Sequence, residues 1–146
     1  KNAGIDCNEI EVKSNEVFFL RDNQLVFPVA AKEKLVKKAD GWALDIYVFS
    51  PRPLDDLLIE PNMPKLTLVV KAKECQLAIN DKAYVAASQN RHEATYKELP
   101  LLQGWNKVSI KIGERDKNEF SGNFRCDNRN EFLSSLKVMF VNPEVK

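Results

Sequence analysis

The segment 101–112 constrains the fold more than any other part of this sequence. A turn carrying Gly104 and Asn106 leads into a stretch in which Val108, Ile110 and Ile112 alternate with two lysines and a serine. Apolar side chains at every second position are typical of an antiparallel strand with one buried face and one face in water. A chain built from such strands has to bury one side of each sheet against another sheet.

The same two-residue period recurs along the chain, with Pro, Gly, Asn or Asp between the repeats. Asn and Asp at residues 22–23 and 80–81 predict hairpin turns there. Short strands separated by about 8–15 residues, with little helix, indicate an all-β antiparallel sandwich. At 146 residues, the chain fits the size of a single domain covering residues 1–146. The strand-like segments are 16–21, 25–29, 44–49, 66–72, 75–79, 83–86, 107–112, 120–126 and 136–140.

Two segments depart from this pattern. In residues 30–40, Ala31, Leu35 and Ala39 recur at a spacing of four, and Gly41 stands where a helix C-cap would. The sequence therefore predicts at most one short helix, of about three turns, with a loop as the alternative for this segment. Residues 88–98 are polar, and we expect them to form a loop.

Composition narrows the possible partners. The 22 basic and 21 acidic side chains leave a net charge of +1, which argues against nucleic acid as a partner because there is no field to attract it. No apolar run is long enough to span a membrane. The chain begins without Met or a hydrophobic leader, so we interpret its start as a processed end or a cut inside a longer protein.

Three segments, taken in order, resemble galactose-binding-like jelly-roll accessory domains of bacterial glycoside hydrolases. They are residues 40–51, residues 77–82, and the strand at residues 104–112 followed by residues 120–121. Asp81 departs from the resemblance, because these domains usually have Gly there, and the turn type is therefore in doubt. The resemblance covers about residues 40–125 and implies a jelly-roll β-sandwich. It also implies a non-catalytic carbohydrate-binding or structural accessory module.

Such a module would belong to an exported bacterial glycan-degrading protein (periplasmic, cell-surface or secreted), with a neighbouring catalytic domain and a glycan as its partners. Sugar recognition requires flat rings that stack on C–H faces and polar groups that read hydroxyls. Candidate rings are Trp42 and Trp105, each beside a glycine, and Tyr84. In an alternative interpretation, both tryptophans cap the hydrophobic core. The candidate polar partners, taken from the longest polar loops, are Arg91, Asn128 and Arg129.

Catalytic chemistry has little support in the sequence. His92 is the only histidine and has no nucleophile motif nearby, so we interpret it as a solvated loop residue. Asp55 and Asp56 are adjacent, which suits a surface turn better than a pair of catalytic carboxylates. Two other classes remain as alternatives: a protein–protein adhesion or assembly module, and a small glycan-active enzyme.

No cofactor is expected, although the Asp and Asn oxygens of residues 127–130 leave a structural calcium ion open. The three cysteines, Cys7, Cys75 and Cys126, are widely spaced and lack metal-ligand spacing. We expect Cys75 and Cys126 to point inward as small apolar side chains. A single disulfide remains open for an exported chain.

Overall fold

The computed structural model describes residues 18–54, 64–126 and 129–140, which are mainly β-strand. The described ranges also contain three short 3-10 helices, η2 (Val29–Lys34), η3 (Lys117–Glu119) and η4 (Asn130–Ser135). The strands are β1 (Phe19–Arg21), β2 (Gln24–Val26), β3 (Val36–Lys38), β4 (Gly41–Ser50), β5 (Leu66–Lys71), β6 (Cys75–Ile79), β7 (Lys82–Tyr84), β8 (Ser88–Gln89), β9 (Ala94–Leu99), β10 (Gly104–Gly113), β11 (Ser121–Arg125) and β12 (Lys137–Met139).

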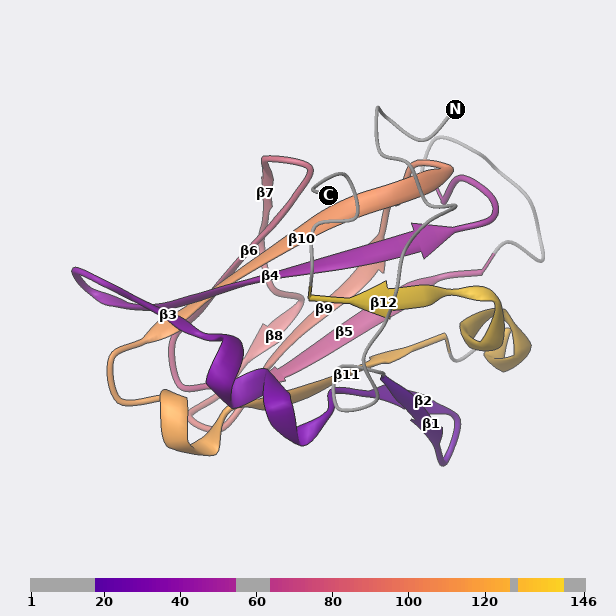
Figure 1. Ribbon diagram of the computed structural model, residues 1–146. Coiled ribbons are helices and arrows are strands. Elements are labelled where there is room, and N and C mark those ends of the chain that lie inside the picture. The colour runs from indigo at the N-terminus through magenta and orange to yellow at the C-terminus, as the bar shows by residue number, and fades with distance from the viewer. Residues whose placement is uncertain (1–17, 55–63, 127–128, 141–146) are drawn as a thin grey trace.

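The strands form two antiparallel sheets, which Figure 1 shows as two layers. The first, which we call sheet A, has the order β1-β2-β11-β5-β9-β8. The second, sheet B, has the order β12-β4-β10-β6-β7, and β3 pairs with β4. The all-β antiparallel sandwich predicted from the sequence is confirmed.

One main hydrophobic core fills the space between the sheets. Sheet B contributes Ile46, Val48 and Ile110, and sheet A contributes Leu68 and Val70, all of which are at most 1% exposed. These residues occupy every second position of β4, β10 and β5, as the alternation in the sequence predicts. The fold thus follows from sheets that each have one apolar face.

Strand β10 lies in the middle of sheet B, paired with β4 on one side and with β6 on the other. Its Asn106 is fully buried. The Asn106 Oδ1 atom accepts hydrogen bonds from the Leu102 backbone N–H (2.8 Å) and from the Asn80 side-chain amide (2.9 Å). Its Nδ2 atom donates to the carbonyls of Leu102, Gly104 and Val48. The Gly–Trp–Asn motif is therefore a structural junction between strands.

The predicted helix over residues 30–40 is wrong in extent. The segment begins as the 3-10 helix η2, but it continues as β3, which pairs with β4. Gly41 is not a helix cap: it opens β4, and a Cβ atom there would collide with the backbone carbonyl of Ile112. With η3 and η4, the described residues contain three short 3-10 helices rather than at most one helix.

The expected loop over residues 88–98 is also wrong, because it contains β8 and most of β9. Ala94 and Tyr96 are buried and face the core, at most 1% exposed. The pairing of β9 with β5 then shifts register before Leu99, and Glu98 has a positive φ of 53°. This irregularity breaks the two-residue alternation, so the strand lacks a regular sequence signature.

Two tight hairpins have the turn chemistry that the sequence predicts. In the β1–β2 hairpin, Asp22 and Asn23 have φ of 50° and 63°, and in the β6–β7 hairpin Asn80 and Asp81 have φ of 51° and 70°. Positive φ at both central residues is what a type I′ turn requires. Asp81 therefore adopts the positive φ that Gly would supply in the resembled motif.

Candidate functional site

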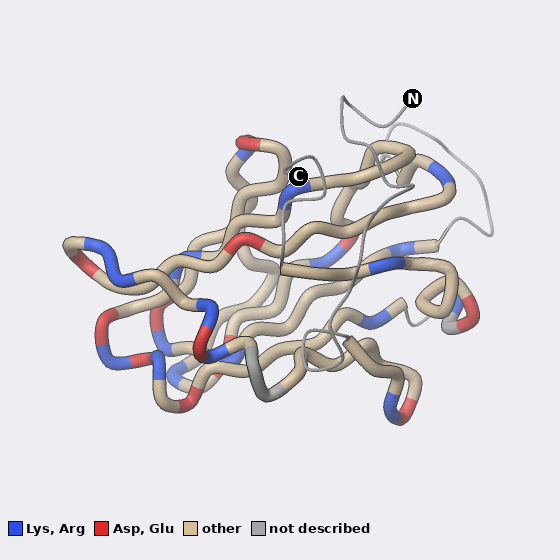
Figure 2. The backbone as a smooth tube through the Cα atoms, in the orientation of Figure 1, with Lys and Arg blue, Asp and Glu red and all other residues tan. Residues whose placement is uncertain are grey.

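The β3–β4 turn, the β5–β6 loop and the segment between β10 and β11 lie at one end of the sandwich. In sheet B, Gly41 pairs with Gly113 and β6 begins opposite Ile112. In sheet A, Ser121 pairs with Lys71, which directly precedes the β5–β6 loop. We call this region the loop end. Figure 2 shows charged residues of both signs along its turns.

The carboxylate of Asp116 holds two of these segments together. It accepts hydrogen bonds from the backbone N–H groups of Lys73 (2.9 Å), Glu74 (3.0 Å) and Gly113 (3.0 Å). One side chain thus satisfies donors from the β5–β6 loop and from the end of β10. Charge-assisted hydrogen bonds of this kind are stronger than neutral ones, so the two loops are fixed relative to each other.

The amide of Gln89 joins the β8–β9 loop to the same region. Its Nε2 atom lies 2.8–3.4 Å from four backbone carbonyl oxygens, those of Ala72, Lys73, Asn90 and Glu93. The first two belong to the β5–β6 side and the last two to the β8–β9 loop. Gln89 therefore brings an edge strand of sheet A into the loop end.

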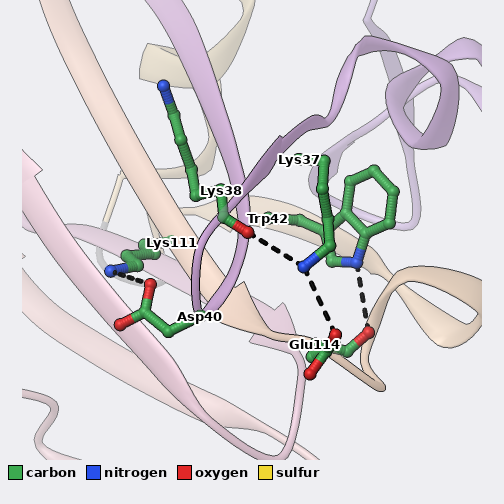
Figure 3. Close-up of polar contacts among 6 residues, drawn as sticks. All are labelled: Lys37, Lys38, Asp40, Trp42, Lys111 and Glu114. Atoms are coloured by element: carbon green, nitrogen blue, oxygen red, sulfur yellow. Dashed lines mark hydrogen bonds and ion pairs between the residues drawn. The ribbon is translucent and has the colours of Figure 1, made fainter.

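Trp42 also lies at the loop end, half-buried against the main core. Its Nε1–H donates to the carbonyl oxygen of Glu114 at 3.1 Å. The ammonium groups of Lys117 and Lys37 lie 4.1 Å and 5.6 Å from the ring centroid, and Lys37 pairs with the Glu114 carboxylate at 3.4 Å. Figure 3 shows the Trp42 ring beside the Lys37–Glu114 pair. A sugar ring stacking on Trp42 would compete with these cation–π contacts.

A second ion pair lies on the other side of the β3–β4 turn, as Figure 3 shows. The Lys111 ammonium is 2.7 Å from the Asp40 carboxylate. The hydrogen bond and the positive charge of Lys111 lower the pKa of Asp40 below its ordinary value of 3.8. Asp40 is therefore ionised across the neutral range, and the pair contributes one charge of each sign to the site.

A surface pocket of about 360 Å³ lies among these groups, and we call it the end pocket. Two carboxylates, two ammonium groups and two amides line it, so its charges balance. Ile112 and Gly113 also line it. The six polar side chains are those of Asp40, Glu74, Lys73, Lys111, Gln76 and Gln89.

Cys75 also lines the end pocket, at the start of β6. Its carbonyl oxygen accepts a hydrogen bond from the Tyr96 hydroxyl at 3.3 Å. Burial raises the pKa of the Cys75 thiol to about 11, and burial likewise raises the pKa of Tyr96. At neutral pH both groups carry their protons. The end pocket therefore holds no thiolate nucleophile.

The structure separates the two tryptophans that the sequence nominates. Trp105 pairs with Phe49 at the far end of β10, whereas Trp42 pairs with Ile112 at the loop end. Trp105 is 1% exposed in a second apolar cluster with Tyr47 and Met139, against which Phe49 packs. No face of the Trp105 indole is available to stack on a sugar. The alternative of a packing role fits this residue.

The other nominated residues lie in different places. Arg91 is exposed in the β8–β9 loop, two residues after Gln89, and so belongs to the loop end; His92 beside it is exposed, as expected. Tyr84 is half-buried at the edge of sheet B, packs on the core, and has the Lys82 ammonium 5.7 Å from its ring. Of the nominated ligand-binding residues, the loop end thus brings together Trp42 and Arg91.

Arg129 lies beyond Arg125, which pairs with Thr67 at the opposite end of sheet A from Lys71. It forms a 2.5 Å ion pair with Glu131, which lowers the pKa of that carboxyl. Asn128, Asp127, Asp55 and Asp56 lie outside the described residues. The calcium ion left open at residues 127–130 and the surface-turn interpretation of Asp55 and Asp56 therefore concern residues outside the described ranges.

Residues 18–54, 64–126 and 129–140 contain no cluster of three or more Asp, Glu, His or Cys side chains placed to hold a metal ion. Of the cysteines in the same ranges, Cys126 is fully buried, as expected, and Cys75 is half-buried.

Sequence reasoning missed the residues that organise the end pocket. The sequence does not single out Asp116 and Gln89, because each lies in an ordinary charged or polar stretch, or Gln76, because it occupies an outward position of an ordinary strand. Their proximity depends on pairings between strands that are distant along the chain. The available signal is weak: Asp116 lies within the charged turn at residues 113–117, where an Asp side chain can accept hydrogen bonds from backbone N–H groups.

No protein-family model, curated protein or solved structure matches this chain. Among the described residues, the structure contains no helix with the length and apolar character required to cross a membrane. The fold class, an all-β antiparallel sandwich, is thus defined by the structure itself.

Proposed function

We propose that this chain is a non-catalytic carbohydrate-binding module of an exported bacterial glycan-degrading protein, and that a sugar unit binds in the end pocket. The observation that supports this most is the set of donors and acceptors around that pocket. Sugar hydroxyls both donate and accept hydrogen bonds, and amides, carboxylates and ammonium groups together match both roles.

The charge balance of the end pocket favours a neutral sugar. Asp40 and Glu74 offset Lys73 and Lys111, so an uncharged ligand meets no net field. A volume of about 360 Å³ falls within the range of small-ligand sites, roughly 300–1,000 Å³. These features support a pocket that forms hydrogen bonds with the hydroxyl groups of a neutral ligand rather than one that attracts an ion.

The loops around the pocket are held in place before any ligand binds. Asp116 ties three backbone N–H groups together, and Gln89 links four carbonyls. Binding to a site that is already ordered loses less conformational entropy. Trp42 and Arg91, at the same end, are the residues we expect to contact further sugar units of a longer glycan.

A glycan array with the full chain, followed by calorimetry on any retained glycan, tests the proposal. Gln76→Ala removes one amide from the end pocket and is expected to weaken binding about tenfold. The matched control is Gln103→Ala, an exposed glutamine in the turn before β10 at the far end of the sandwich, which should bind normally. Trp42→Ala should weaken binding of oligosaccharides more than that of monosaccharides.

Failure to retain any glycan would contradict the proposal and favour a bracing role against a catalytic domain. Equal glycan affinities of the Gln76→Ala and Gln103→Ala variants would show that the sugar does not bind in the end pocket. As an independent readout, a bound sugar should slow alkylation of Cys75, which lines the same pocket.

A further inference from the structure

A row of polar side chains crosses the loop end on the outer face of sheet B. Lys111 of β10 pairs with Gln76 of β6 on one side and with Ala43 of β4 on the other. The residues before and after Lys111 in β10 are buried in the core, so Lys111 points to the opposite, outer face. On the β4 side, the Lys111 ammonium is 2.7 Å from the carboxylate of Asp40, in the β3–β4 turn. Gln76, Lys111 and Asp40 all line the end pocket.

The Asp40–Lys111 pair differs from a second ion pair that the same strand forms. Lys107, near the other end of β10, lies 3.7 Å from Asp81, and neither residue lines the end pocket. Both lysine side chains are 38% exposed, so the exposure of the lysine does not distinguish the two pairs. What distinguishes the Asp40–Lys111 pair is its shorter contact and its place on the wall of a pocket. It presents charged hydrogen-bonding groups to whatever binds there.

The Asp40–Lys111 pair keeps hydrogen-bonding capacity for a ligand. An ammonium group has three donors and a carboxylate has two acceptor oxygens, so one contact between them uses only part of each group. The carboxylate is ionised across the neutral range, because Lys111 lowers the pKa of Asp40. A ligand in the end pocket therefore meets an acceptor and a donor that lie about one hydrogen-bond length apart. Hydrogen bonds to ionised groups are stronger than those between neutral groups.

From this arrangement we propose that the end pocket selects neutral sugars with two free hydroxyl groups on adjacent ring carbons, and that the Asp40–Lys111 pair selects them. This inference rests on the function proposed above. Gauche hydroxyl groups on adjacent carbons of a pyranose ring also place their oxygens about one hydrogen-bond length apart. One hydroxyl donates to Asp40, and its neighbour accepts from Lys111. A sugar that lacks either hydroxyl loses one of these charge-assisted hydrogen bonds.

NMR titration of the full ¹⁵N-labelled chain tests this inference. The probes are the methyl glycosides of galactose, glucose and mannose, followed by each monodeoxy derivative of the one that binds most tightly. We expect saturable shifts at Gln76 and Lys111. Two derivatives, which lack hydroxyl groups on neighbouring carbons, should bind at least tenfold more weakly than the parent glycoside, and the other derivatives should lose less affinity.

Variants of the ion pair assign the selection to its two residues. Lys111→Met should weaken binding of the parent glycoside about tenfold and remove the difference between it and the two weak derivatives. Asp40→Asn should act in the same direction, because an amide oxygen accepts more weakly than a carboxylate. The matched controls, Lys107→Met and Asp81→Asn, break the other ion pair of β10 and should keep both the affinity and the deoxy pattern. Exposed pairs contribute little to stability, so the melting temperatures should change little.

The results separate this inference from the function proposed above. Weakened positions that are not adjacent, or a deoxy pattern that survives in Lys111→Met, would overturn the inference and leave a sugar in the end pocket. Failure of all three methyl glycosides to bind would overturn it as well. The glycan array then shows whether the proposed function fails with it, because retention of any glycan would leave that function standing.

Discussion

Asn106 shows how one buried amide can hold several segments of a sandwich together. Its oxygen accepts two hydrogen bonds and its nitrogen donates to three carbonyls, although the side chain is fully buried. The contacts reach β4 through Val48 and the β6–β7 turn through Asn80. A fully satisfied buried network of this kind specifies one arrangement of the strands.

Replacing Asn106 with Ala should therefore be strongly destabilising. The change leaves the Leu102 N–H, the Asn80 amide and buried carbonyls without partners, so we expect the free energy of unfolding to fall by about 3 kcal/mol or more. Urea denaturation measures the loss. Asn118→Ala, at an exposed position, is the control and should change stability by no more than about 0.5 kcal/mol. Equal effects of the two changes would contradict the role given to Asn106.

Cys75 should react slowly with alkylating reagents in the folded protein. Because burial raises its thiol pKa from 9.0 to about 11, the thiolate fraction near pH 8 is about a hundredfold lower than in the unfolded chain. The iodoacetamide rate at Cys75, followed by mass spectrometry of its peptide, should differ between native and urea-unfolded protein by at least that factor. A native rate close to the unfolded rate would show an accessible thiolate.

The same pKa shift has a consequence for stability. A group whose pKa is raised on folding contributes stability that is fully present below its unfolded pKa. For Cys75 that contribution is complete below about pH 9 and is lost as the pH rises through about 11. Alkaline destabilisation in this window should be smaller in Cys75→Ala than in the parent chain.

At the scale of elements, the hairpins illustrate local chemistry that the fold uses directly. Asn80 and Asp81 both adopt positive φ in the β6–β7 turn, and Asn–Gly is the pair that such a turn favours most. Asp81→Gly removes the strain of a left-handed aspartate but also an exposed 3.7 Å ion pair with Lys107. Exposed pairs of this kind contribute little.

We therefore expect Asp81→Gly to raise the free energy of unfolding by about 0.5–1 kcal/mol. Thermal denaturation followed by circular dichroism provides the measurement, and Asp81→Ala is the matched control. Alanine removes the same ion pair but keeps the strain of a positive φ at a residue with a side chain. The Asp81→Ala variant should therefore be less stable than the parent chain. Stabilisation by both variants would assign the effect to the lost charge rather than to the turn.

Strands β3 and β9 show where element prediction fails. β3 follows a short 3-10 helix, and its three residues are exposed, so the sequence offers no alternation there. In β9 the register shift and the positive φ of Glu98 interrupt the pattern that Ala94 and Tyr96 begin. Both strands exist because a neighbouring strand, β4 or β5, offers a free edge for pairing.

At the scale of the molecule, one continuous core joins both sheets, and this favours a single cooperative transition. Trp42 and Trp105 lie at opposite ends of the β4–β10 pair and can report on it separately. In Trp105→Phe and Trp42→Phe variants, the fluorescence of the remaining tryptophan should have the same urea midpoint as the circular dichroism of that variant. If the Trp42 fluorescence of the Trp105→Phe variant changes at a lower urea concentration than its circular dichroism, the loop end unfolds independently.

The sequence alone determined that this chain forms antiparallel sheets and which face of most strands is buried, because a two-residue period is a local property of extended backbone. It also placed the two tight hairpins, because Asn and Asp tolerate positive φ. Only the tertiary structure decided that Trp105 is buried with Tyr47 and Met139, that Arg129 lies far from Trp42, and which loops share an end. Those outcomes depend on pairing between strands distant in sequence, such as β10 with β4 and β11 with β5, which local periodicity does not encode.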